Sequence, residues 1–485
     1  MSYLKLFSVL TLLAPLLWPT SAYTWPNTDT DILEAIYYQQ IGYDGRRFSA
    51  FVRTCETGNN LGPGRTNSAE WIRTAYHDMA TADVETGIGG MDASIGFERS
   101  RQENVGFHAF TETLLFFGDF MSARSSMADL IALGAVMSVT ACTISPNRKP
   151  LFLPFRAGRV DATEAGPFGT PEPHQDLTSH TRSFEKQGFN STEMIGLVAC
   201  GHSLGGVNGR DFPEIVPAKN DSTNVDSKQA FDTNTVPKGV QLSEVITPIP
   251  LKPDNLFIAM NDGGNMTITG DIRIRIDDNL PTDSRQVFIH FKPRSPSTPA
   301  IPPVEATRLS ENTTAWHPYA PSFEWWNFTT TVPASQGFES FTVEVVDDGQ
   351  STVHANGGGG FPLQTDLIPQ NHLSCSSVYL GRAYLLNLTV AVRDELNFQD
   401  VKLTVPIPVR QAESVVPRFE SHVLDMEKTG VLADTGYSLY TASLDVRPEH
   451  MYVTIMSYGL SGRGGARDVE VPFVLWKGMG TCPYS

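Results

Sequence analysis

The chain has 485 residues, of which 40% are hydrophobic and 18% charged, and it carries a net charge of −17 at pH 7 with an isoelectric point near 5.1. This length allows two or three domains with proper cores, and the composition excludes a disordered chain. The negative charge argues against nucleic acid or an anionic membrane as a partner.

The first 22 residues have the features of a secretory signal peptide. Lys5 precedes an apolar run, and the small residues Thr20-Ser21-Ala22 follow it, which predicts cleavage after Ala22. A membrane anchor is the alternative, but the run is short and Pro15 interrupts it. We therefore expect a secreted protein without a membrane partner. Six Asn-x-Ser/Thr sequons support this, at Asn190, Asn220, Asn265, Asn312, Asn327 and Asn387.

From Asp29 to about Gly206 the sequence predicts helices, because apolar residues recur at three- and four-residue spacing. Asn67 with Glu70, and Asn190 with Glu193, fit capping boxes at helix starts. Gly205-Gly206 is a plausible helix stop. The expected helices lie within 30–42, 67–82, 106–121, 126–143 and 190–203.

From residue 215 to 260 the sequence is polar and contains several prolines, which indicates long loops. After about 265 the apolar period becomes two, and many short strand patterns follow with no helix between them. This predicts antiparallel sandwiches. The expected organisation is a signal peptide (1–22), a mostly α-helical domain (23–265) and an all-β, sandwich-like C-terminal region (266–485).

Residues 70–80 place Arg73 and His77 one helical turn apart. They lie beside a stripe that is expected to be buried, formed by Ile72, Ala75, Tyr76 and Met79. A cation next to a histidine keeps the imidazole neutral, and a neutral imidazole can act as a base. Arg73 can only stabilise negative charge. The pair suits a reaction in which one oxygen gives up a proton and a second departs as an anion. The alternative is an ordinary surface or core feature.

A second stretch, "EMIGLVACGHSLGG" (193–206), reads as an apolar helix that ends at Gly201-His202. A histidine flanked by glycine at a helix end can approach a flat ligand closely, and imidazole is the usual protein ligand of haem iron. The alternative is a histidine that interacts with the helix dipole.

Five motifs stand in one order along the chain: Arg73-Thr-Ala-Tyr-His77-Asp78, "GGMDASI" (89–95), "ENVG" (103–106), "LPFRAGRVDA" (153–162) and "GLVACGHSLGG" (196–206). In this order they resemble the landmarks of the plant-type haem peroxidase superfamily. The resemblance covers about residues 45–265 and says nothing of the β-rich remainder. It implies a mostly α-helical haem peroxidase domain with haem b as its cofactor.

On the side of the haem where peroxide binds, the resemblance implies that His77 is the distal histidine and Arg73 the distal arginine. Asn104 matches the asparagine that fixes the tautomer of this histidine. Tyr76 stands where relatives carry tryptophan or phenylalanine over the haem, and Leu153-Pro154 match the backbone near the peroxide and substrate entrance.

On the opposite side, His202 matches the proximal iron ligand, which needs a carboxylate as hydrogen-bond acceptor. In relatives this aspartate follows an "FD" landmark, which Phe231-Asp232 resembles. Asp262 is then the first candidate for this carboxylate and Asp254 the second. Asp262 also fits an ordinary Asp-Gly turn.

The resemblance further implies a calcium site, because secreted relatives bind calcium through oxygens at the positions of Asp78, Gly90, Asp92 and Ser94. Ser203 and Asp232 correspond less well to a second calcium site. Solvated acidic loops are the alternative for both.

The chain departs from secreted relatives in having five cysteines. By position we expect the disulfides Cys55–Cys142 and Cys375–Cys482, which leaves Cys200 as a buried thiol. No tryptophan lies between Trp71 and Trp316, so a proximal tryptophan radical and a surface tryptophan in the peroxidase half are excluded. We find no convincing acidic trio for manganese.

These observations predict a secreted haem peroxidase that reduces hydrogen peroxide and oxidises an unidentified small electron donor at the haem edge. One alternative is a peroxidase-like scaffold without haem. The other is a cell-wall or carbohydrate-binding protein that acts through the β region, where Trp316, Tyr319, Trp325 and Trp326 cluster in sequence. Such aromatic clusters also form sandwich cores.

Overall fold

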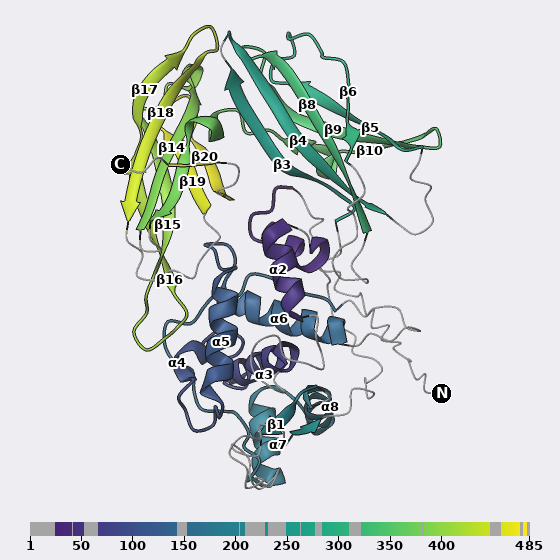
Figure 1. Cartoon of the computed structure of the whole chain (residues 1–485), viewed down its shortest axis with the longest axis vertical. Helices are drawn as coiled ribbons and strands as arrows, with labels where there is room; N and C mark the ends of the chain where they lie inside the picture. Colours follow the sequence, from purple (N-terminus) through teal and green to yellow (C-terminus); the bar gives the residue numbers. More distant parts are fainter. Residues whose placement is uncertain are drawn as a thin grey trace, which may run out of the picture.

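The computed structural model describes residues 25–40, 42–52, 66–142, 153–202, 204–208, 228–230, 249–261, 263–276, 284–309, 322–379, 383–446, 457–475 and 479–482. A helical part lies at one end of the molecule and two β-sandwiches lie side by side at the other (Figure 1). The expected fold class, a mostly α-helical part followed by an all-β sandwich region, is therefore confirmed. The proposed signal peptide, 1–22, lies outside the described residues.

The helical part is organised around α6, which is buried along most of its length. Its aromatic core includes Phe48, Trp71, Phe117 and Phe120, with Phe48 and Phe117 stacked at 5.4 Å between ring centroids. Its elements are α1 (Asp31–Glu34), the π-helix η1 (Ala35–Gln39), α2 (Gly42–Val52), α3 (Asn67–Met79), α4 (Ile95–Glu98), α5 (Phe107–Gly118), α6 (Met127–Cys142), α7 (Leu177–Lys186), α8 (Ser191–Gly201), and the small strands β1 (Gly206–Asn208) and β2 (Lys228–Ala230).

The first sandwich packs the sheet β3-β4-β8-β7 against the sheet β10-β9-β5-β6, in which β11 also pairs with β9. Apolar residues on alternate positions of β4 face its core, which fits the period of two in the sequence. Its strands are β3 (Leu251–Asn261), β4 (Asn265–Ile276), β5 (Gln286–Pro293), β6 (Val304–Glu305), β7 (Thr307–Arg308), β8 (Ser322–Pro333), β9 (Phe338–Asp347), β10 (Gln350–His354) and β11 (Phe361–Pro362).

The second sandwich packs the sheet β17-β18-β14-β13-β21, with β12 beside β14, against the sheet β16-β15-β19-β20. Strand pairs here are antiparallel, except that β21 runs parallel to β13. Its strands are β12 (Leu367–Pro369), β13 (Cys375–Tyr379), β14 (Ala383–Arg393), β15 (Asp400–Val409), β16 (Arg418–Asp425), β17 (Glu427–Leu432), β18 (Tyr437–Val446), β19 (Ser457–Arg463), β20 (Val469–Leu475) and β21 (Gly480–Thr481).

The expectation of loops up to residue 260 is wrong for Leu251–Asn261, which forms strand β3. Pro253 and a bulge between Asp254 and Phe257, where Asn255 has a φ of 47°, hide the alternating pattern. Proline is tolerated because β3 is an edge strand of its sheet.

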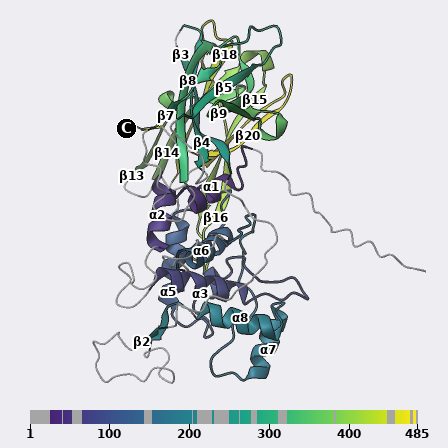
Figure 2. The ribbon, with the colours of Figure 1, turned by 90° about the vertical axis from the view of Figure 1, so that its right-hand side faces the viewer.

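In Figure 2 the helices α1 and α2 lie next to the sandwiches, and side chains of the two parts are buried against each other. Phe323 and Val416, from the two sandwiches, lie in the core of the helical part. Glu34 of α1 is buried against two cations of the β3–β4 hairpin, with Lys252 Nζ at 2.8 Å and Arg273 Nη2 at 2.9 Å. The helical part is therefore anchored to strands that follow it in the sequence.

The N-terminal end of the described chain lies on the first sandwich. The backbone N–H of Trp25 donates to Asn356 Oδ1 at 2.7 Å, and Asn356 Nδ2 donates to the Trp25 carbonyl at 2.8 Å. The chain therefore contacts the β region before it enters the helical part.

The disulfide Cys375–Cys482 is present, as expected, and joins β13 to the residue after β21. Cys142 is disulfide-bonded, and its expected partner Cys55 lies outside the described residues. Cys200 keeps its thiol, whose pKa is raised by partial burial. Among the helices of the described ranges, none has the length and hydrophobicity needed to cross a bilayer.

Candidate active site

Helix α3 carries Arg73 and His77, but its orientation differs from the expected one. Its buried face includes Trp71, Thr74, Ala75 and Asp78. Of the stripe expected to be buried, only Ala75 is, whereas Ile72, Tyr76 and Met79 are partly buried. Because Trp71 fills the aromatic core, the helix is rotated so that His77 is also buried, with 7% of its surface exposed.

The expected capping box at Asn67 and Glu70 is not formed. The helix begins at Asn67, so Thr66 is the N-cap and makes no side-chain cap. Asn67 Nδ2 instead donates to the carbonyl of Phe51 in α2 at 3.0 Å. The amide therefore ties two helices together rather than closing one.

The ring of His77 is fixed by Asn104. His77 Nδ1 and Asn104 Oδ1 are 2.7 Å apart, and Asn104 Nδ2 donates to the Glu98 carbonyl at 2.9 Å. Because Nδ2 is committed to that carbonyl, Oδ1 is the atom that faces the histidine and can only accept. His77 Nδ1 must then carry the hydrogen, which leaves the lone pair on Nε2 for proton transfer.

His77 is held neutral. Burial of the ring is the main cause that lowers its pKa well below the usual value, and the charge of Arg73 lowers it further. The sequence argument named only Arg73, so it identified the lesser cause. A neutral imidazole with an open Nε2 is the protonation state that a general base requires.

Arg73 is positioned by the turn that follows Asn104. Its Nη2 donates to the Val105 carbonyl at 2.7 Å, and its guanidinium carbon lies 4.6 Å from the centroid of the Phe110 ring. Gly106 has a φ of 88°, and a Cβ there would lie 3.4 Å from Arg73 Nη1. Phe110 is also 5.0 Å from the His77 ring, so one buried aromatic side chain supports both residues.

Asp78 holds the loop that leads into α4. Its Oδ2 accepts from the Ala93 N–H at 2.9 Å and its Oδ1 from the Ile95 N–H at 3.0 Å. Burial raises the pKa of this carboxyl well above its usual value. Both oxygens of Asp78 therefore serve the protein backbone.

The other residues of the expected calcium site lie on the same loop. Asp92 Oδ1 accepts from the Ser94 N–H at 3.1 Å, and the Asp92 N–H donates to the Gly90 carbonyl. In the part of the chain that the structure describes, no group of three or more His, Cys, Asp or Glu is arranged to hold a metal ion. Ser203 and Asp232 lie outside the described residues. The structure therefore gives calcium no support.

Helix α8 presents His202. Asn190 caps its start by accepting from the N–H groups of Thr192 at 2.9 Å and Glu193 at 3.0 Å, and Glu193 Oε2 accepts from the Asn190 N–H. The expected capping box is therefore confirmed. The helix ends at Gly201, before the expected stop at Gly205-Gly206, and His202 is its C-cap.

The face of α8 that ends in His202 fits a haem. Ile195, Val198 and His202 follow one another at spacings of three and four, so they share a face of the helix. Ile195 is 65% exposed and Val198 41% exposed, so both side chains are accessible to a ligand. Partial burial lowers the pKa of His202, so its imidazole is neutral and able to bind a metal. An apolar stripe that ends in a neutral imidazole suits a flat, apolar macrocycle with a central iron.

The structure places Tyr76 beside His77 and ties Leu153-Pro154 to η1. The Tyr76 ring stacks on Phe184 of α7 at 5.9 Å and lies edge-on to His77 at 6.2 Å. The Leu153 carbonyl accepts from Tyr37 Oη at 2.9 Å, which anchors the partly buried Pro154.

Of the two candidates for the proximal carboxylate, the structure describes only Asp254. Asp262 lies outside the described residues, and its neighbours Asn261 and Asn265 pair at the end of the β3–β4 hairpin. Asp254 lies in β3 of the first sandwich, where it pairs with Asp271 of β4. The assignment of Asp262 as the proximal carboxylate therefore stays a prediction.

The sequence analysis missed the contacts made by Val105, Glu98 and Phe110. Two of these act through backbone carbonyls, for which the side-chain identity gives no signal. Phe110 could have been proposed only from its position six residues after Asn104, on the apolar face of α5.

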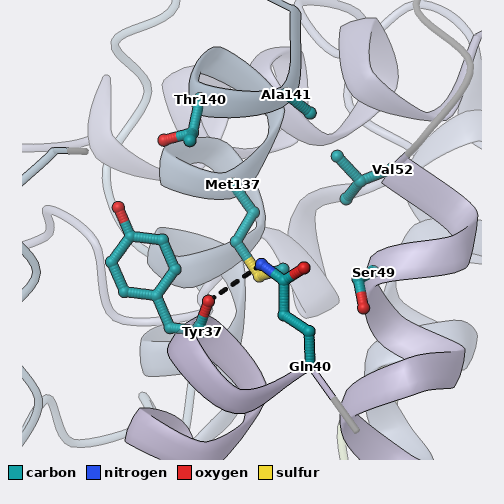
Figure 3. Close-up of a pocket in the computed structure, with 7 residues that line it drawn as sticks. All are labelled: Tyr37, Gln40, Ser49, Val52, Met137, Thr140 and Ala141. Atoms are coloured by element: carbon teal, nitrogen blue, oxygen red, sulfur yellow. Dashed lines mark hydrogen bonds between the residues drawn. The ribbon is translucent and has the colours of Figure 1, made fainter. Parts of the chain in front are cut away.

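A small pocket lies elsewhere, between η1, α2 and α6 (Figure 3). Gln40 Nε2 donates there to the Tyr37 carbonyl at 2.9 Å. None of its lining residues is a residue of the candidate site; they are Tyr37, Gln40, Ser49, Val52, Met137, Thr140 and Ala141.

Comparison with known proteins links this site to a family. A family model described as peroxidase matches residues 53–280. The chain is 30% identical over 505 residues to a WSC domain-containing protein of Arthroderma benhamiae, an alignment that covers 90% of this chain and 64% of that protein. It is 28% identical over 227 residues to a versatile peroxidase of Pleurotus eryngii, covering 44% of this chain and 56% of that one.

It is also 32% identical over 143 residues to the mitochondrial cytochrome c peroxidase of Neurospora crassa, covering 28% of this chain and 37% of that one. The chain thus spans less than two thirds of the length of each of these relatives. The matched residues 53–280 contain Arg73, His77, Asn104 and His202 in the order and setting described above. Residues 53–280 therefore match the peroxidase family, which supports the resemblance to the plant-type haem peroxidase superfamily.

Proposed function

We propose that the protein is a secreted haem peroxidase that reduces hydrogen peroxide and oxidises small donors by one electron at a time at the haem edge. The observation that carries the proposal is the neutral His77, whose Nδ1–H is bound by Asn104 and whose neighbour is the Arg73 cation. The peroxidase family match over residues 53–280 supports it.

The residues that would hold haem b are those of the exposed stripe on α8. His202 would bind the iron, and Ile195 and Val198 would pack against the porphyrin face. The bound haem would supply the iron that binds peroxide and exchanges electrons with it.

The protein residues would manage the proton and the charge. His77 Nε2 takes the proton from one oxygen of hydrogen peroxide and delivers it to the other oxygen, which leaves as water. Arg73 stabilises the negative charge that develops on the departing oxygen. Asn104 keeps His77 in the tautomer that makes Nε2 the acceptor.

His77→Leu tests the proposal. We expect the variant to bind hemin normally, because His202 is untouched, and to react with peroxide about 10²–10⁴-fold more slowly, since acid–base help is lost. Stopped-flow absorption of the hemin-loaded protein measures the rate. His174→Leu, at an exposed histidine outside the site, is the matched control. A parental rate in His77→Leu would show that His77 is not the base.

A visible absorption spectrum distinguishes a haem peroxidase from a peroxidase-like scaffold without haem. Purified protein supplied with hemin should show the Soret band of ferric, histidine-ligated haem, and the band should shift when peroxide is added. Turnover with phenols, manganese(II), ascorbate and cytochrome c would then identify the donor class.

The described aromatic residues do not favour a carbohydrate-binding role. Trp325 packs against the helical core and Trp326, 5% exposed, lies in the core of the first sandwich. Trp316 and Tyr319 lie outside the described residues. Contact with cell-wall polysaccharide therefore remains a separate hypothesis, which binding of the full chain to such polymers would test.

A further inference from the structure

The loop between β15 and β16, residues 410–417, extends from the second sandwich to α4 of the helical part (Figure 1). Ser414 is 6% exposed and Val416 1% exposed. Val416 belongs to the core of the helical part and not to the core of its own sandwich. The partly buried Val415 and Phe419 pack against the same helical core.

Hydrogen bonds within the loop hold it in one conformation. Gln411 Nε2 donates to the Val416 carbonyl at 2.9 Å, and the Val416 N–H donates to Ser414 Oγ at 3.1 Å. Both bonds are buried and join residues of the loop itself, so they fix its conformation without help from solvent.

The loop packs tightly against α4 at Gly96. A Cβ built on Gly96 would lie 2.7 Å from Ser414 Oγ and 2.7 Å from Val416 Cγ2. The backbone of α4 therefore lies directly against these two side chains, at a distance that only glycine permits.

Helix α4 in turn binds two residues that are next to His77, one along the chain and one through a hydrogen bond. Its first residue, Ile95, donates its N–H to Asp78, the residue that follows His77. Its last residue, Glu98, supplies the carbonyl that orients the Asn104 amide, and Asn104 binds His77 Nδ1. A shift of this single helical turn would therefore move both supports of His77 together.

We propose that Ser414 and Val416 of the β region are positioning residues for His77, acting through Gly96 and the α4 turn. The C-terminal half would then form part of the support of the peroxidase site instead of an appended module. The contact stands on geometry alone; its catalytic consequence rests on the proposed function.

Val416→Ala tests the contact without requiring haem. Removing two methyl groups opens a cavity behind Gly96, so α4 should open locally more often. Hydrogen–deuterium exchange of peptides covering residues 92–98 should report the Ala93 and Ile95 amides, which are bound to Asp78. We expect exchange about tenfold faster than in the parent, equivalent to ~1.4 kcal/mol.

Val405→Ala is the matched control. Val405 lies in β15, is 3% exposed and belongs to the core of the second sandwich. It should weaken that sandwich while leaving exchange at residues 92–98 near the parental rate. Equal exchange at 92–98 in the two variants, or an unchanged rate in Val416→Ala, would overturn the proposal. Should Val416→Ala fail to fold, Ser414→Ala gives the same comparison with a smaller cavity.

The hemin-loaded protein tests the consequence for His77. Val416→Ala should slow the reaction with peroxide more than Val405→Ala does, by up to about 100-fold, because small displacements of a catalytic group are costly. Equal rates would overturn the positioning role. A parent that binds hemin but does not react with peroxide would refute the proposed function, while the exchange comparison would still decide the contact.

Discussion

Asp161 closes the start of α6 with its carboxylate. Oδ2 accepts from the Met127 N–H at 3.0 Å and Oδ1 from the Ala128 N–H at 2.8 Å. A negative charge at a helix N-terminus is usually favourable. Here burial outweighs that benefit and raises the pKa of Asp161 to about 6, and the charges of Asp129 and Asp92 act in the same direction.

This shift predicts how stability depends on pH. The folded state keeps the Asp161 proton up to about pH 6, whereas the unfolded chain releases it near 3.8. Stability from this group is therefore complete below 3.8 and is lost as pH rises to about 6. In urea unfolding, the free energy of unfolding of Asp161→Asn relative to the parent should rise as the pH increases from about 4 to 7. The rise should be on the order of 3 kcal/mol. Parallel pH curves would contradict the assignment.

For single residues, the sequence predicted identities better than environments. The resemblance named His77, Arg73 and Asn104, and the structure places His77 and Asn104 at 2.7 Å. The burial that keeps His77 neutral and the Val105 carbonyl that holds Arg73 depend on tertiary packing. The motif around His77 cannot predict this burial or this carbonyl, because both are supplied by other segments of the chain.

Among the elements, α8 is the one whose stability bears most directly on the candidate cofactor site. Its capping box is made by Asn190, which is also the first residue of a sequon. Loss of an N-cap costs about 0.5–2 kcal/mol in helix stability. Because α8 ends in His202, fraying of the helix would loosen the candidate iron ligand.

Three variants separate the cap from glycosylation. Asn190→Ala removes both and should lower the free energy of unfolding by about 1 kcal/mol and weaken hemin affinity. Asn190→Asp keeps a side-chain cap but removes the sequon, and Thr192→Ala removes only the sequon. Both should match the parent in thermal unfolding and hemin titration. A loss in all three would assign the effect to the glycan.

The sequence predicted elements well where the local signal agreed with packing. The capping box predicted for α8 is formed. The one predicted for α3 is not, because Asn67 instead binds the Phe51 carbonyl. The predictions missed β3, where Pro253 and a bulge interrupt the period. In each failure a contact or irregularity outside the local pattern decided the outcome.

For the whole molecule, the buried ionic group of Glu34, Lys252 and Arg273 joins α1 to the first sandwich. The exposed side-chain fractions are 1% for Glu34, 5% for Lys252 and 0% for Arg273. Burial alone would raise the pKa of Glu34, but the two cations lower it overall. Removal of the carboxylate would leave two buried cations without their shared anion.

Glu34→Ala should therefore destabilise the chain by about 3–5 kcal/mol, the usual result of breaking one side of a buried ion pair. Denaturant unfolding followed by tryptophan fluorescence measures this. Glu339→Ala is the control, because the Lys292–Glu339 pair is 62% and 58% exposed and such pairs contribute about 0–1 kcal/mol. Similar losses in both variants would show that burial of the group has no special weight.

The sequence separated a helical half from a β half correctly but could not show that they share a core. Periodicity reports that a strand residue such as Phe323 is buried, and not which segment it is buried against. Val416 lies in a loop, where no period applies. The partner of each became visible only in the folded chain.

The place of Val416 has a consequence for synthesis. A ribosome delivers the N-terminal end first, so α3 emerges well before the valine that completes its surroundings. At translation speeds of about 5–20 residues per second, the 349 residues from Asn67 to Val416 take roughly 20–70 s. During that interval the nascent helices lack the residues that complete their core. A chaperone that binds exposed apolar surface would therefore be expected to bind this half until translation nears its end.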